Sequence, residues 1–166
     1  MSVYQIISTL KKLNEVHVQL LEIGKEKQQA IIKNDSFVLT TLMTKENRLL
    51  KKMDDIEVQR GEAVTSFLSE KGIRSQLNLT VSEISRLVFD PDEKRELLEI
   101  RDLLVDNTMQ LKKQNEHTKE LLEQSLHFID FSLNLIFGVD EDMIYRKPTD
   151  QQPTLTNRNN YFDTKA

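Results

Sequence analysis

The chain contains no cysteine and no tryptophan, and it has only four glycines and three prolines among 166 residues. Without cysteine it has no disulfide framework and no cysteine-based metal site. The scarcity of glycine and proline favours long helices over a β fold with many turns. No stretch approaches the roughly 18 apolar residues of a membrane span, and the N-terminal residues lack the pattern of a signal peptide. We therefore expect a cytoplasmic all-α protein without direct membrane insertion.

Charge of one sign does not dominate any part of the sequence. The net charge is −4, with 30% of residues charged. The basic pairs Lys11-Lys12, Lys51-Lys52 and Lys112-Lys113 each lie close to glutamate or aspartate, which is typical of solvated helix faces. Nucleic-acid binding would require one contiguous basic stripe. The sequence predicts no nucleic-acid partner.

The first long segment, residues 3–33, carries one apolar stripe. Its residues recur at steps of three and four, as on one face of an amphipathic helix: Val3, Ile6, Ile7, Leu10, Leu13, Val16, Leu20, Ile23, Ala30 and Ile31. Gly24 and Lys27 weaken this stripe near its end. Gly24 and Lys25 lack the other residues of a phosphate-binding loop, so we interpret Gly24 as an exposed, weak turn of helix.

The second segment, residues 36–71, has the strictest pattern. Steps of three and four alternate without a slip through Leu39, Leu42, Glu46, Leu49, Met53, Ile56, Arg60, Ala63 and Phe67. This is the heptad pattern by which helices pair. Glu46 and Arg60 interrupt it, and polar residues in such a seam commonly fix register. We expect that role for both.

A short helix, residues 81–89, precedes the longest segment, residues 91–137. The long helix is predicted to begin after the N-cap Asp90, with Pro91 at its first position, and to end at Gly138. It contains no glycine and no further proline, and would be roughly 70 Å long. Its last third is the most apolar part of the chain.

Helical spacing places five apolar residues of that last third along one face: Leu122, Leu126, Ile129, Leu133 and Ile136. Leu121, Phe128, Phe131 and Leu135 lie elsewhere around the helix. The apolar surface is therefore too wide for a two-helix seam. Either the helix is buried on most sides, or part of this surface awaits a partner helix.

Together these segments predict an elongated antiparallel bundle of three long helices and one short connecting helix, residues 1–138. Residues 139–166 are polar, have no apolar period and form a predicted flexible tail. Near its end this tail carries two adjacent aromatic residues, Tyr161 and Phe162, which a simple linker would not need.

The sequence offers no catalytic or metal-binding arrangement. No zinc-protease motif occurs, and no Glu-x-x-His spacing of a di-iron bundle is present. His117 and His127 are ten residues apart, about 80–100° from a common helix face, so they do not share a metal. We predict no enzymatic activity, no metal and no cofactor. A bundle enzyme would reveal itself by a bound metal or cofactor.

Two segments resemble the FlgN family of flagellar type III export chaperones. One is Leu111–Leu126, with Phe128, Ile129 and Leu133 following; the other is the run from Leu39 through Glu46 to Arg60. The ending Phe162–Ala166 is similar to that of Gram-positive members. One position departs from the pattern, because Thr118 stands where the family often has a second asparagine.

The resemblance implies a cytoplasmic chaperone that binds hook-associated proteins of the hook–filament junction and delivers them to the cytoplasmic domain of the export gate protein. It acts transiently at the membrane-associated export apparatus. We expect the client to contact Leu122, Leu126, Ile129, Leu133, Ile136, Tyr161 and Phe162. Tyr145 or Tyr161 is expected to contact the export gate. The alternative is a structural coiled-coil protein whose surplus apolar surface is an oligomer interface, and a weak homodimer fits either hypothesis.

Overall fold

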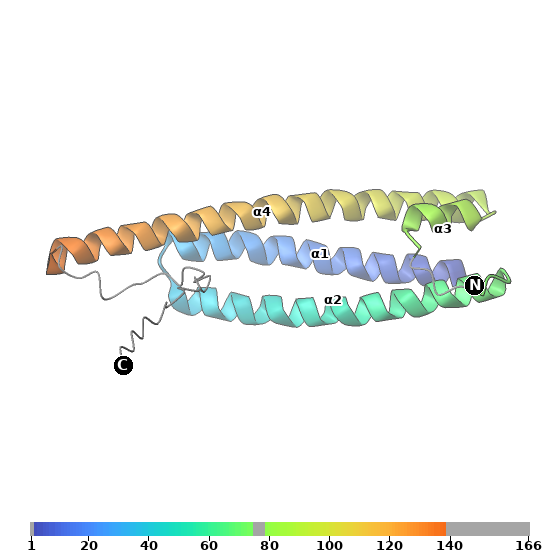
Figure 1. The fold of residues 1–166 in the computed structure, drawn as a ribbon, viewed down its shortest axis with the longest axis horizontal. Coiled ribbons are helices and arrows are strands. Elements are labelled where there is room, and N and C mark those ends of the chain that lie inside the picture. The colour runs from blue at the N-terminus through green and yellow to red at the C-terminus, as the bar shows by residue number, and fades with distance from the viewer. Residues whose placement is uncertain (1, 75–78, 139–166) are drawn as a thin grey trace, which may run out of the picture. The chain divides into compact units, whose positions relative to one another are not determined.

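The computed structural model describes residues 2–74 and 79–138, and it confirms the all-α prediction. The helices of this described part are α1 (Ser2–Ile32), α2 (Ser36–Glu70), α3 (Val81–Leu87) and α4 (Pro91–Phe137) (Figure 1). The chain divides into two compact units, residues 1–127 and 128–166, and each is considered by itself below. Of the second unit, the described part is the end of α4 and Gly138.

Side chains at the N-caps satisfy the first free N–H groups of α2, α3 and α4. The Asp35 carboxylate accepts a hydrogen bond from Val38 N at 3.0 Å. Before α3, Thr80 and Glu83 form a reciprocal capping box, and these bonds lower the pKa of the Glu83 carboxyl. The Asp90 carboxylate accepts from the N–H groups of Asp92 and Glu93, which fixes the start of α4 at Pro91.

Left-handed residues end the long helices. Asn34 and Gly72 have φ of 54° and 74°, and in both cases the next residue donates its N–H to a carbonyl five positions back. This is the Schellman arrangement, which turns the chain sharply after α1 and α2. Gly138, with φ of 83°, ends α4 as the sequence predicts. Helix α3 ends at Leu87 because Val88 is extended.

The heptad pattern of α2 agrees with its burial at every position. All nine members, from Leu39 to Phe67, are buried or half-buried, including Glu46 and Arg60. The apolar stripe of α1 is buried in the same way, with Ile23 half-buried. The two helices therefore pair antiparallel through the faces that their sequences predict.

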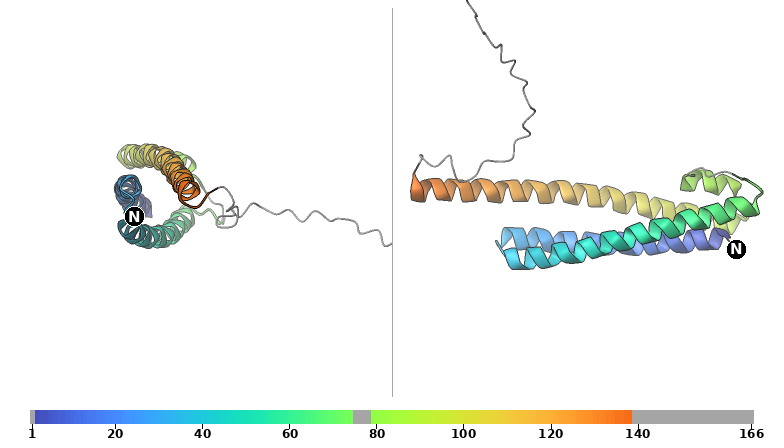
Figure 2. Two further views of the ribbon diagram at one scale, coloured as in Figure 1. Left: turned by 90° about the vertical axis from the view of Figure 1, so that its left-hand side faces the viewer. Right: turned by 60° about the horizontal axis from the view of Figure 1, so that its bottom comes forward.

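Two apolar clusters form the core of the first unit. The larger one joins the beginnings of α1 and α4 to the end of α2 and to α3: Val3, Ile6, Ile7, Leu10, Ala63, Val64, Phe67, Leu68, Ile84, Val88, Leu97 and Ile100. The smaller one contains Leu13, Val16, Leu20 and Ile56. Figures 1 and 2 show α3 lying at the end of the hairpin where α4 begins, as this clustering requires.

One ionisable side chain, His17, lies among these apolar residues of α1. It is 8% exposed, and its Nδ1 has no hydrogen-bond partner among the described residues. Burial lowers the pKa of His17 below its ordinary value, against a smaller opposing effect of Glu57. The folded state therefore favours the neutral imidazole.

We expect acid to destabilise the protein through His17. As the pH falls below about 6.5, the unfolded chain takes up a proton at this histidine before the folded chain does, so folding stability falls. Thermal unfolding followed by circular dichroism at about pH 7.5 and about pH 5.5 measures the effect. His17→Leu should reduce the difference, whereas the exposed His117→Gln should leave it unchanged. Equal pH dependence in wild type and His17→Leu would contradict the assignment.

Candidate functional site

The last third of α4 carries five of the predicted client-binding residues, and four of these five are exposed. In the first unit, Leu122 and Leu126 are 40% and 44% exposed. In the second, Ile129 and Ile136 are 48% and 71% exposed, whereas Leu133 is half-buried. By contrast, Leu97 near the start of the same helix is fully buried.

Other apolar side chains of this segment are exposed as well. In the second unit these are Phe128, Phe131, Leu135 and Phe137. Of the two alternatives that the sequence leaves open, the described residues do not bury this helix on most sides. An apolar surface of this kind, without cover, is typical of an interaction site.

The side of α4 that faces α1 follows a different seven-residue pattern, through Leu104, Asn107, Leu111, Gln114 and Thr118. Three of these five residues, Asn107, Gln114 and Thr118, are polar. Asn107 Nδ2 donates to Asn14 Oδ1 at 2.6 Å, and Gln114 Nε2 donates to Leu21 O at 2.9 Å. Between Asn107 and Gln114, α4 therefore pairs with α1 through side-chain hydrogen bonds in addition to apolar contacts.

Thr118 takes part in the same seam. It is 7% exposed, and its hydroxyl accepts from Gln28 Nε2 at 3.2 Å while donating to Gln114 O at 2.8 Å. Gln28 Nε2 also contacts Gln114 O at 3.3 Å. The residue that departs from the resembled family pattern thus lies buried between α1 and α4.

Gly24 is buried, so its interpretation as an exposed, weak turn of helix is wrong. A Cβ at this position would overlap the side-chain amide of Gln114. The Gln114 amide lies against the backbone of α1 at this point, so any larger residue would require the Gln114 side chain to move. Sequence reasoning missed this contact because its two partners are 90 positions apart.

Lys27, which weakens the apolar stripe of α1, lies opposite Glu46 of α2. Its Nζ donates to both carboxylate oxygens at 2.8 Å, and the two side chains are 12% and 23% exposed. Arg60, the other polar residue of the heptad, pairs with Glu57 on its own helix at 2.8 Å. A register-setting role therefore remains a prediction for both, with a cross-helix partner visible for Glu46.

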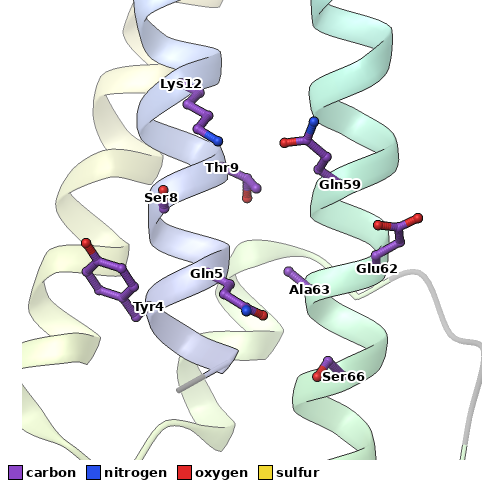
Figure 3. Close-up of a pocket in the computed structure, with 9 residues that line it drawn as sticks. All are labelled: Tyr4, Gln5, Ser8, Thr9, Lys12, Gln59, Glu62, Ala63 and Ser66. Atoms are coloured by element: carbon purple, nitrogen blue, oxygen red, sulfur yellow. The ribbon is translucent and has the colours of Figure 1, made fainter.

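Among the hollows of the described residues, two are lined by side chains of both α1 and α2. The first encloses about 440 Å³ and is lined by polar side chains of both helices, among them Gln5, Lys12, Gln59 and Glu62 (Figure 3). The second, of about 470 Å³, is apolar and lies nearer the α1–α2 turn, with Ile23 and Leu49 in its lining. Neither contains histidine, and within residues 2–74 and 79–138 no cluster of acidic or histidine side chains could hold a metal ion.

Three predicted contacts lie outside the described residues, namely Tyr145, Tyr161 and Phe162, together with the whole predicted tail 139–166. None of the helices in the described ranges is long and apolar enough to cross a membrane.

Comparison with known proteins gives two findings. The family model described as FlgN protein matches residues 1–153. The chain is also 27% identical over 166 residues to the uncharacterized protein YvyG of Bacillus subtilis (strain 168), and the match covers the whole of both chains. No solved structure matches.

Proposed function

The chain belongs to the FlgN family of flagellar export chaperones, and from this premise we propose that it binds hook-associated proteins in the cytoplasm before their export. The client-binding surface is the exposed apolar part of α4. The chaperone then delivers its client to the cytoplasmic domain of the export gate protein. FlgN proteins are a chaperone family and not an enzyme family, which agrees with the prediction that the chain has no catalytic role.

The observation that carries this proposal is the exposure of Leu122, Leu126, Ile129 and Ile136 on one helix. Helical spacing places them along a single face, the arrangement that an amphipathic client helix can cover. A subunit of a filament junction exposes such a helix before assembly, and an uncovered apolar helix promotes premature association. Covering it requires apolar surface alone, without a nucleotide or a metal.

Charge substitutions on this face should abolish client binding. The triple variant Leu126→Glu, Ile129→Glu and Ile136→Glu removes three apolar side chains from the proposed interface. Because burial of each contributes about 1.5–3 kcal/mol, affinity should fall by a factor on the order of a thousand or more. Titration calorimetry with a purified hook-associated protein of the same bacterium measures this loss.

A matched control lies further back on α4. Leu103, Val105 and Met109 are also exposed, at 52%, 47% and 67%, but lie outside the proposed face. Their replacement by glutamate adds the same charge to the same helix and should leave affinity unchanged. If both triple variants bind as the wild type does, the client uses another surface.

The predicted tail contacts need a separate experiment. A variant ending after Gly138 lacks Tyr145, Tyr161 and Phe162, and we expect it to bind the client less tightly. Tyr145→Ala and Tyr161→Ala, made singly, should show which of the two tyrosines contacts the export gate, because only that variant should weaken capture by the export gate domain. Unchanged client affinity in the shortened chain would exclude the tail from the client site.

The alternative, an oligomer interface, makes an opposite forecast for the same variants. If the exposed face of α4 joins copies of this chain, light scattering should show a tight oligomer that the Leu126, Ile129 and Ile136 substitutions convert to monomer. A chaperone should be a monomer or a loose dimer in the absence of client.

A further inference from the structure

The α1–α2 hairpin has two long sides, and α4 covers only one of them. Asn14, Leu21 and Gln28 of α1 provide the hydrogen bonds to α4. At about 100° per residue, Ile23 lies about 180° around α1 from Asn14. The apolar hollow that contains Ile23 therefore lies on the side of the hairpin away from α4.

This hollow, here called the hairpin groove, has an almost entirely apolar surface of carbon atoms. It encloses about 470 Å³ between Gln19, Glu22 and Ile23 of α1 and Lys45, Arg48, Leu49 and Lys52 of α2. Ile23 and Leu49 are half-buried and form its floor. No described residue covers this floor, although both positions belong to the apolar patterns by which the two helices pair.

The α2 edge of the groove is basic. Lys45, Arg48 and Lys52 follow one another at steps of three and four, so they form one stripe along the edge. All three are exposed, and none makes an ion pair with another residue of the described ranges. In a chain with a net charge of −4, this is a local excess of positive charge beside an apolar surface.

On the opposite edge, Glu22 pairs with Lys25 at 3.7 Å. The negative charge of Glu22 on the α1 edge is therefore balanced by Lys25. The positive charges of Lys45, Arg48 and Lys52 on the α2 edge are not balanced in this way. A ligand that satisfies this site needs apolar groups for the floor and negative charge on one side.

We infer that the hairpin groove is a docking site for an acidic amphipathic helix of a partner protein, separate from the proposed client surface on α4. A groove between two antiparallel helices is the place where another helix packs, with anchors at i, i+3, i+4 and i+7. Aspartate or glutamate beside those anchors would pair with Lys45, Arg48 and Lys52. The partner helix would pack on α1 and α2, on the side of the hairpin away from α4.

The probe for this site is a synthetic helical peptide with leucine at i, i+3, i+4 and i+7 and glutamate at the flanking positions. Fluorescence anisotropy with the full chain should show binding that weakens as salt rises, because exposed charge pairs are screened. A peptide of the same composition in scrambled order, and one with lysine in place of glutamate, should not bind. Failure of the acidic peptide to bind would overturn the inference.

Charge reversal at the basic edge gives the decisive comparison. The triple variant Lys45→Glu, Arg48→Glu and Lys52→Glu should reduce peptide affinity roughly ten- to hundredfold. Lys51→Glu is the control, since Lys51 is exposed on the same helix but does not line the groove. Equal affinity in the triple variant and the wild type would also overturn the inference.

Other occupants give different results. If the chain's own residues 139–166 fill the groove, their removal should raise peptide affinity, and the assignment to a partner protein fails. If a second copy fills it, the triple variant should dissociate a dimer in light scattering, with the same consequence. The client-binding experiment on Leu126, Ile129 and Ile136 is independent of all these outcomes.

Discussion

Phe67→Ala should destabilise the protein by about 3–5 kcal/mol, the largest effect expected of any single substitution considered. Phe67 is 1% exposed and lies in the larger apolar cluster, where α1, α2, α3 and α4 meet. Removing its ring leaves a cavity that four elements would have to close together. Urea unfolding followed by circular dichroism should show a midpoint shifted to lower concentration.

Phe37→Ala is the matched control because Phe37 lies on the same helix but is 80% exposed. Its loss should change the unfolding free energy by less than about 0.5 kcal/mol. Similar midpoints for the two variants would mean that the four elements do not share one core at this end of the bundle.

Reversing either charge of the Lys27–Glu46 pair should have the second-largest effect on the free energy of unfolding. These side chains are 12% and 23% exposed, so a repelling pair or a charge without a partner is poorly compensated by water. Lys27→Glu and Glu46→Lys should each destabilise the protein by roughly 2–4 kcal/mol. The double variant restores opposite charges and should regain most of the lost stability, as urea unfolding can show.

The surface pair Lys25–Glu22, whose side chains are 70% and 65% exposed, provides the comparison. The same reversals there should each change stability by less than about 0.5 kcal/mol. If the Lys27 and Glu46 double variant is as unstable as the sum of its singles, the pair does not fix the register of α1 against α2.

The sequence predicts the α1–α2 hairpin in detail because the features that define it involve residues close together along the chain. The alternating steps of α2 mark which residues lie inside, and every residue from Leu39 to Phe67 in that pattern is buried or half-buried. The beginnings of α2, α3 and α4 follow from Asp35, Thr80 and Asp90, whose side chains accept hydrogen bonds from N–H groups two or three positions later. Such features need no knowledge of the tertiary structure.

What the sequence does not reveal depends on partners that are distant along the chain. From the sequence, Gly24 and Lys27 only weaken the apolar stripe of α1. In the structure, Gln114 lies against Gly24, and Glu46 pairs with Lys27. For the last third of α4, periodicity shows a wide apolar surface but cannot say whether other helices cover it. The exposure of Ile129 and Ile136 is therefore structural information.

The hydrogen bonds between α1 and α4 affect the alignment of the two helices more than the stability of their contact. Water can replace the partners of Asn107, Gln114 and Thr118 when the helices separate, so each of these bonds contributes only modestly to the free energy of folding. Yet only one alignment restores all these bonds and places the Gln114 amide beside Gly24. Between Asn107 and Thr118, the seam thus specifies a single alignment of α4 on α1.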